Sequence, residues 1–129
     1  MSASEKHILV VDDAISMRKF IIKTLMQQGY REFTEAEDGV QALDILTQSV
    51  GGKKIDLVIL DWSMPRMNGF ELLEKMKNNS LLQTIPVLMV TAESLYDHVI
   101  QALRVGAKNY IIKPFTPDLL IEKVEKILR

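Results

Sequence analysis

The sequence predicts an α/β protein, built as a single doubly wound sheet of five parallel strands with five helices. Short apolar runs alternate with longer amphipathic stretches along the whole chain, and that alternation places helices over both faces of a parallel sheet. The length of 129 residues suits one domain. Hydrophobic residues make up 47% of the chain and charged residues 26%, which is enough apolar material for a core.

The five predicted strands differ in polarity. The runs at 7–11, 56–60 and 86–90 are largely apolar, as strands buried on both faces must be. The run at 32–36 alternates polar and apolar residues, and the run at 109–112 is short and leads into a lysine. We therefore expect these two strands at the sheet edges, with the strand order 2-1-3-4-5.

Caps and breakers bound the five predicted helices. Apolar residues recur at helical spacing from 15 to 28, where a glycine ends the pattern. The fourth predicted helix spans about 94–105 and also ends at a glycine. The other three have polar N-caps whose side chains can accept backbone N–H groups: Asp38, Asn68 and Thr116.

Charge and cysteine content exclude several classes of protein. Sixteen basic and seventeen acidic residues leave a net charge of −1, without a basic stripe, so we expect no nucleic-acid partner. The chain has no cysteine, which is compatible with a reducing cytoplasm. No signal peptide is recognisable, and the apolar runs are far shorter than a bilayer span, so we expect a cytoplasmic protein without a membrane partner.

Polar side chains follow four of the predicted strands. Asp12 and Asp13 follow the first strand, Asp61 the third, Thr91 the fourth and Lys113 the fifth. In an open parallel sheet these positions share one rim, where ligands bind. Three carboxylates there repel one another, so a cation is expected. Magnesium suits best, because it takes one or two carboxylates, keeps waters and shares phosphoryl oxygens.

Asp61 is the predicted nucleophile of this rim. A neutralised carboxylate can attack phosphorus and form an acyl phosphate, while Lys113, the Thr91 hydroxyl and nearby backbone N–H groups hold the phosphoryl oxygens. Asp61 alone could equally be a polar stop at a strand end. Its combination with the other rim residues favours the phosphoacceptor.

Four segments, "VVDD", "LDWSMPRMNG", "MVTAE" and "KPFTP", together resemble the receiver domain of two-component response regulators. The resemblance covers essentially the whole chain, 1–129, as one receiver domain without an output domain. It is strongest to chemotaxis regulators of the CheY type. The strand order predicted above is the one known for flavodoxin and CheY themselves, so it is a property of that known fold.

The resemblance implies a role for each rim residue. Asp61 matches the phosphoacceptor, Asp13 a direct magnesium ligand, and Asp12 a ligand that acts largely through water. Ser63 would offer its backbone carbonyl to the same single Mg²⁺. Thr91 matches one half of the phosphoryl-sensing pair.

The resemblance also implies the elements of a switch. Lys113 completes the phosphoryl-sensing pair, and the peptide bond from Lys113 to Pro114 is cis in the family. The backbone of Ala92 would contact the phosphoryl group, and Tyr110 matches an aromatic residue that turns inward when Thr91 moves.

Ser63 departs from the family pattern, because well-known chemotaxis regulators have asparagine there. Its side chain and Glu93 flank the path of the hydrolytic water in the family. These two residues are therefore expected to modulate dephosphorylation.

The fourth predicted helix leaves two interpretations open, because its apolar residues are spread round most of its surface. It could be deeply packed. Alternatively, it could contribute to a partner face that matches the fourth helix–fifth strand–fifth helix surface of the family. That face would comprise Tyr96, Val99, Leu103, Tyr110 and Lys123.

Other singled-out residues have plainer interpretations. Trp62 is expected in the loop beside the site, and Met64 and Met67 in packing. His7 and His98 are expected at the surface, since two unpaired histidines do not indicate a zinc site.

The expected function is a phosphorylation-controlled switch and not a turnover enzyme. We expect a monomer whose partners are a sensor histidine kinase, the flagellar motor switch and a phosphatase. The alternative is a stand-alone receiver that acts as a phosphate sink, a relay intermediate or a regulator of a non-motor partner. A magnesium-dependent aspartyl phosphatase is disfavoured because Ser63 replaces its second acid. A flavodoxin is disfavoured because acids replace its phosphate loop.

Overall fold

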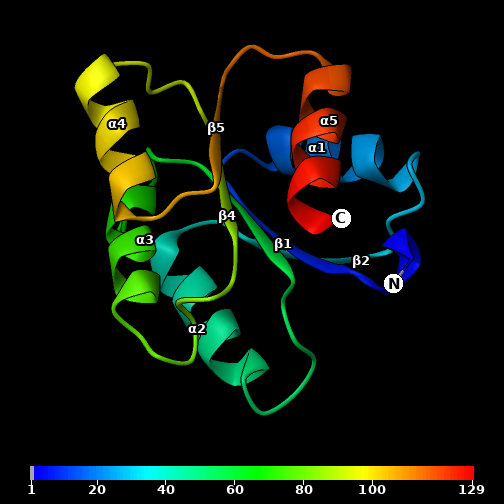
Figure 1. Cartoon of the computed structure of the whole chain (residues 1–129), viewed down its shortest axis with the longest axis horizontal. Helices are drawn as coiled ribbons and strands as arrows, with labels where there is room; N and C mark the ends of the chain where they lie inside the picture. The colour runs from blue at the N-terminus through cyan, green and yellow to red at the C-terminus, as the bar shows by residue number, and fades with distance from the viewer. Residues whose placement is uncertain (1) are drawn as a thin grey trace.

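The computed structural model describes residues 2–129 and contains one five-stranded parallel sheet (Figure 1). The strand order is β2-β1-β3-β4-β5, so the predicted order and both predicted edge strands are confirmed. The strands are β1 (His7–Val11), β2 (Glu32–Ala36), β3 (Leu57–Leu60), β4 (Val87–Thr91) and β5 (Asn109–Ile112).

Five α-helices cover the two faces of the sheet, as predicted. α1 and α5 pack on one face, and α2, α3 and α4 pack on the other (Figure 1). A short 3₁₀ helix, Ala3–Glu5, precedes β1 and was not predicted. The helices are α1 (Ile15–Met26), α2 (Gly39–Ser49), α3 (Gly69–Lys77), α4 (Tyr96–Val105) and α5 (Pro117–Leu128).

Two apolar layers hold the helices to the sheet. Alternate residues of β1 face opposite sides, so Ile8 and Val10 pack under α1 and α5 while Leu9 and Val11 pack under the other helices. Every residue of β3 and β4 is buried, whereas β2 is mostly half-buried. Each fully buried aliphatic side chain contributes about 1.5–3 kcal/mol to stability. The centre of the sheet is therefore a rigid base for whatever its carboxyl ends carry.

The predicted caps at Asp38, Asn68 and Thr116 are all present. Asp38 accepts from Gln41 N at 2.8 Å, Asn68 accepts from Glu71 N at 2.9 Å, and Thr116 Oγ1 accepts from Leu119 N at 3.2 Å. Each bond satisfies one of the N–H groups that a helix start leaves without an intrahelical partner.

Helix α4 is not deeply packed, so that interpretation was wrong. Ala102 is its one buried residue, while Tyr96 is 76% exposed and Leu103 38% exposed. Its N-cap residue is Leu95, whose side chain cannot accept a hydrogen bond. The apolar residues round α4 are therefore largely a surface feature.

Within residues 2–129, none of the helices has the length and apolar character that crossing a membrane requires.

Candidate functional site

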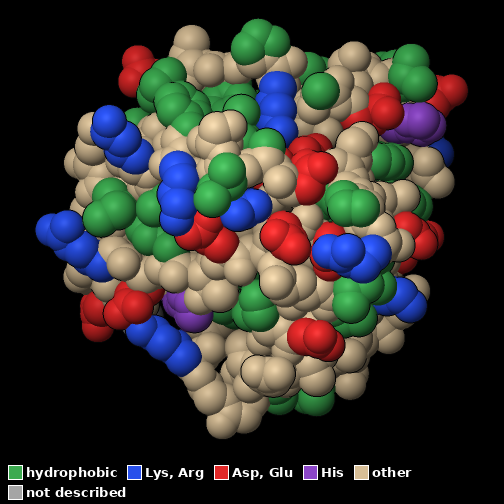
Figure 2. Space-filling view, turned by 180° about the vertical axis from the view of Figure 1, so that it is seen from behind, with side chains coloured by type: hydrophobic (Ala, Val, Ile, Leu, Met, Phe, Trp, Pro, Cys, Tyr) green, Lys and Arg blue, Asp and Glu red, His purple; other side chains and the backbone are tan. Residues whose placement is uncertain are grey.

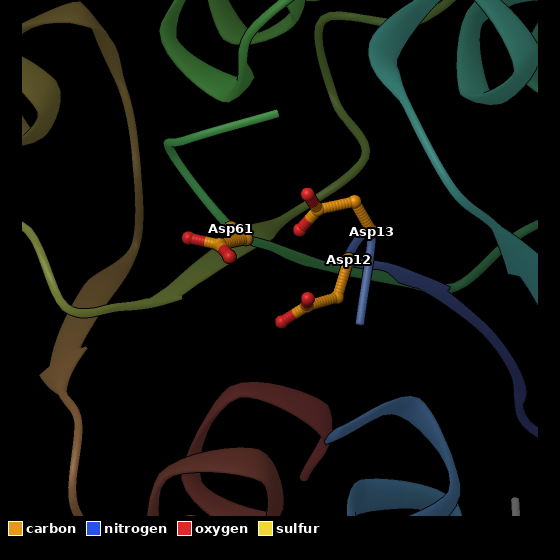
Figure 3. A group of neighbouring side chains, drawn as sticks. All are labelled: Asp12, Asp13 and Asp61. Atoms are coloured by element: carbon orange, nitrogen blue, oxygen red, sulfur yellow. The ribbon is translucent and has the colours of Figure 1, made fainter. Parts of the chain in front are cut away.

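Three carboxylates meet at the carboxyl ends of β1 and β3 (Figure 3). One oxygen each from Asp12, Asp13 and Asp61 lies within 4.8 Å of the other two. Asp12 and Asp61 are only 2% and 7% exposed, while Asp13 is open to solvent. Because β1 and β3 are parallel neighbours, the first residue beyond each reaches the same rim, as the sequence predicted.

Lys113 joins this cluster from the end of β5. Its Nζ donates to Asp12 Oδ2 at 2.8 Å and to Asp61 Oδ2 at 3.2 Å. The Lys113–Pro114 peptide bond is cis, as the resemblance implied. One ammonium group thus faces three carboxylates, and a net negative charge is left on the rim.

Burial and neighbouring charges shift the pKa values of this cluster. Burial raises the pKa of the Asp12 carboxyl above its ordinary value; Asp61 adds to the shift, while Lys113 and the Ala14 N–H oppose it. For Lys113, burial favours the neutral amine, but contacts with Asp12 and Asp61 outweigh burial and raise the pKa. Lys113 is therefore a fixed positive charge beside Asp61 at neutral pH.

The donor set fits a hard divalent cation. It offers three carboxylates and nearby backbone carbonyls, which are oxygen ligands of the kind that Mg²⁺ takes. The charge left over after Lys113 favours a second cation at the same place. Asp12, Asp13 and Asp61 are the residues that the structure brings together to hold it. Ser63, whose carbonyl the resemblance adds to this set, is exposed two residues after Asp61.

Thr91 and Tyr110 lie on one chain of hydrogen bonds that runs away from this cluster. Thr91 is 1% exposed, and its Oγ1 accepts from Glu93 N at 3.2 Å. The Tyr110 hydroxyl donates to the Glu93 carbonyl at 2.7 Å. Burial, Glu93 and Asp61 raise the pKa of Tyr110 to about 12, so the phenol stays protonated as the donor. Thr91 lies outside α4, whose N-cap residue is Leu95.

The loop after Asp61 is pinned at two places. A Cβ on Gly69 would lie 1.9 Å from the Asp61 carbonyl oxygen, so only glycine allows α3 to start this close to Asp61. Arg66 adopts a positive φ of 66° and forms an ion pair with Asp38 across to α2. Its Nε donates to Asp38 Oδ2 at 2.7 Å. Two tertiary contacts thus fix the loop that follows Asp61: the close approach of Gly69 to the Asp61 backbone and the Arg66–Asp38 ion pair.

Contacts of three residues, Arg18, His98 and His7, were not predicted. Arg18 of α1 donates to the Asp12 carbonyl at 2.6 Å and pairs with Glu35 at 2.8 Å. His98 stacks on Trp62, while its side chain remains 40% exposed, so it lies at the surface as predicted. His7 is half-buried, with Nε2 2.7 Å from Thr34 Oγ1. Apart from the hydrogen bond between Arg18 and Asp12, these contacts join segments distant in the chain, so no local pattern marks the residues.

The remaining predicted residues lie at the rim and around the fifth strand. Ala92 is exposed and directly follows Thr91 at the rim. Val99 and Tyr110 are half-buried at the junction of α4 and β5, and Lys123 is half-buried on α5. The predicted partner face therefore wraps round the β5 edge of the sheet (Figure 1).

Comparison with known proteins defines the class. Residues 8–125 match the response regulator receiver domain, and the chain belongs to this family. Its α/β fold and the rim of acidic residues after β1 and β3 agree with that assignment.

Individual relatives point to one branch of that family. The chain is 45% identical over 121 residues to a protein named chemotaxis protein CheY homolog from Campylobacter jejuni, covering 94% of this chain and 91% of the relative. It also resembles the solved chemotaxis response regulator CheY4 of Vibrio cholerae, with 33% identity, a TM-score of 0.84 and coverage of 95% and 98%. The Mn²⁺-bound form of response regulator Rcp1 shares 27% identity, with a TM-score of 0.81 and coverage of 95% and 91%. This is a receiver domain of CheY type, consistent with a two-component response regulator in chemotaxis.

Proposed function

We propose that Asp61 accepts a phosphoryl group from a phosphohistidine of a sensor kinase, and that this switches the binding of a partner. The observation that carries the proposal is the arrangement of Asp61, nearly buried, between two further carboxylates and the Lys113 ammonium. This cluster of carboxylates lowers the stability of the fold, because buried like charges repel. It becomes useful when a cation and an anionic phosphoryl group arrive together.

The transfer would form a bond between an Asp61 carboxylate oxygen and phosphorus while the P–N bond of the donor breaks. The donor imidazole leaves with the electron pair of that bond. Lys113, already 3.2 Å from Asp61 Oδ2, would stabilise charge on the phosphoryl oxygens. The Thr91 hydroxyl and the Ala92 backbone would contact the other oxygens.

Asp12, Asp13, Asp61 and the Ser63 carbonyl would hold one Mg²⁺, which neutralises carboxylate and phosphoryl charge when bound. The Mn²⁺-bound form of the relative Rcp1 supports a divalent cation in this fold. Ser63 and Glu93 would set how readily water reaches the acyl phosphate. The protein is then a switch that returns to its starting state, not an enzyme acting on a separate substrate.

The change of state would be a population shift toward a conformation in which Thr91 contacts the phosphoryl group. Because Glu93 N donates to Thr91 and the Glu93 carbonyl accepts from Tyr110, movement of Thr91 would disturb the Tyr110 hydroxyl. The CheY-type relatives favour chemotaxis, with a chemotaxis kinase and the flagellar motor switch as partners and a phosphatase for the reverse step. A cytoplasmic location and a monomeric state belong to the same proposal.

Replacing the acceptor tests the chemistry directly. With Mg²⁺ and acetyl phosphate, wild type should gain the mass of one phosphoryl group, and Asp61→Asn should gain none. Asp44→Asn, which alters an exposed carboxylate of α2, is the matched control and should label like wild type. Trp62 fluorescence, next to the acceptor, should respond to Mg²⁺ and again to beryllofluoride only when Asp61 is present. Equal labelling of Asp61→Asn would rule out Asp61 as the acceptor.

The partner face is tested separately, with a peptide from the flagellar motor switch protein. The double variant Tyr96→Ala/Val99→Ala should weaken binding of the activated protein about tenfold or more, since exposed aromatic anchors dominate such contacts. Its labelling by acetyl phosphate should remain. Joint loss of labelling and binding would mean that these side chains support the fold. Absence of peptide binding by activated wild type would favour the sink, relay or non-motor role.

A further inference from the structure

An aromatic stack connects the acceptor loop to two helices. The indole of Trp62 stacks with the ring of Phe70 in α3, with 5.0 Å between centroids, and with the imidazole of His98 in α4, with 5.2 Å between centroids. The interplanar angles are 17° and 21°, so each of these two rings is nearly parallel to the indole. Trp62 is bonded to Asp61, and this stack therefore begins one residue from the proposed acceptor.

His98 is held in this stack by the loop that precedes α4. Its Nδ1 is buried and lies 3.3 Å from Glu93 Oε1, though without the alignment of a hydrogen bond. The same Glu93 oxygen accepts from Leu95 N at 3.0 Å, at the start of α4. The imidazole is thus fixed between the acceptor loop on one side and the start of its own helix on the other.

Helix α4 has few other anchors near its N-terminus. Its N-cap residue offers no side-chain acceptor, and its one buried residue, Ala102, lies in the second half of the helix. Tyr96 and Asp97, in the first turn, are exposed. His98 is therefore one of the few contacts that position this end of α4, together with the half-buried Val99 and Ile100.

We propose that His98 is a positioning residue, which couples the acceptor loop to α4 through its stack on Trp62. This inference rests on the proposed function, because phosphorylation of Asp61 is the event that would use the coupling. It adds a second route to α4, distinct from the hydrogen bonds that join Thr91, Glu93 and Tyr110.

The physical basis is the steep dependence of ring stacking on separation and offset. A shift of the backbone at Asp61 moves the attached indole, and α4 must then follow or lose the contact. Such a ring pair changes an equilibrium constant by roughly 2- to 12-fold. That range is enough to bias a helix with one buried residue, and it is small enough to leave the fold intact.

The test compares His98→Ala, which removes the ring, with His98→Phe, which keeps a flat ring. Gln101→Ala, an exposed residue of the same helix, is the matched control. The measurement is amide hydrogen exchange of residues 62–68 and 96–105, without and with Mg²⁺ and beryllofluoride. Without beryllofluoride, His98→Ala should speed exchange at 62–68 by roughly 2- to 12-fold. His98→Phe and Gln101→Ala should match wild type.

With beryllofluoride, all variants should still show the change at 62–68, but His98→Ala should lose most of the change at 96–105. His98→Phe should restore it, which a purely structural loss would not allow. Wild-type exchange of both segments in His98→Ala would overturn the inference, as would equal loss in the Ala and Phe variants. Absence of any beryllofluoride response in wild type would instead count against the proposed function, while the first comparison still decides whether the stack couples the two segments.

Discussion

Helices α3 and α4 lie side by side on the same face of the sheet, yet they are held in opposite ways (Figure 1). α3 begins with a complete capping box of Asn68 and Glu71, and it buries Gly69, Leu72, Leu73 and Met76. α4 has no side-chain cap and buries only Ala102.

The contrast indicates that α3 is firmly held and that α4 is the helix whose position is more easily changed. Local opening costs little where few apolar contacts and no caps hold an element, and elements that move in switching are drawn from that group. α3 fixes the acceptor loop, because Gly69 packs on the Asp61 backbone and Phe70 on Trp62. α4 carries the exposed apolar residues of the predicted partner face. A switch needs both, a rigid site and a helix whose position is easily biased.

Helix α1 lies on the other face of the sheet and can be compared with α3 and α4. Figure 2 shows the molecule from behind, with Lys and Arg side chains among hydrophobic ones over α1. The hollow there is lined by Ile22 and Met26 with Lys19, Lys23 and Arg31 at its edges. Below this surface α1 buries Arg18, Ile21, Thr24 and Leu25. α1 is therefore firmly packed like α3, and among these three helices only α4 is lightly held.

The largest expected difference between the two helices comes from truncating one leucine in each. Leu72→Ala in α3 empties a fully buried site and should lower the free energy of unfolding by about 2–5 kcal/mol. Leu103→Ala in α4 removes a side chain that is 38% exposed and should cost less, about 1 kcal/mol or below. Urea unfolding measures both. Equal losses would mean that α4 is as firmly packed as α3.

Substitutions at the N-caps of α3 and α4 should change the free energy of unfolding by smaller amounts and in opposite directions. Asn68→Ala should destabilise the protein by about 0.5–2 kcal/mol, because Glu71 N loses its acceptor. Leu95→Ser should stabilise it by up to about 1 kcal/mol, because the new hydroxyl can accept an N–H group in the first turn of α4. Thermal unfolding of the two variants against wild type checks both signs. A destabilising Leu95→Ser would show that the leucine contributes packing there.

The smallest expected effect is a pH dependence confined to the start of α4. The Leu95 N–H and, less strongly, His98 hold the pKa of Glu93 below its ordinary value of 4.5. A lowered folded-state pKa means that the stabilisation is present above 4.5 and is lost as pH falls through the lowered value. Protection of the Leu95 amide should therefore decline in that acidic window while α3 stays protected.

Glu93→Gln supplies the control for that experiment. The amide cannot ionise, so protection of Leu95 should no longer vary with pH in the same window. A decline that persists in Glu93→Gln would assign the effect to another titrating group.

The class of fold and most of the rim could be predicted from local patterns. Apolar runs such as 57–60 indicated buried strands, and the residues directly after them, Asp12, Asp61 and Lys113, had to share the rim of a parallel sheet. Asp38, Asn68 and Thr116 acted as the caps that their side chains favour. Element boundaries shifted by one or two residues: the first helix ends at Met26, and the third strand begins at Leu57.

The prediction was least certain for α4, and the reason is physical. Apolar residues spread round a helix are compatible with a deep position in a core and with an exposed docking surface, since both satisfy the same spacing. Which of the two holds depends on what packs against the helix. Only the folded chain shows that Ala102 is the one buried residue of α4 and that Tyr96 stands in solvent.

The sequence by itself determined the sheet, its order, its caps and the acidic residues of its rim, because each depends on residue type at a strand, a strand end or a helix start. The tertiary structure decided how those parts connect. The Arg66–Asp38 ion pair, the Arg18–Glu35 ion pair and the stack of His98 on Trp62 each join segments distant in the chain. Such contacts depend on where whole helices settle on the sheet, and that position is set by packing of the entire core.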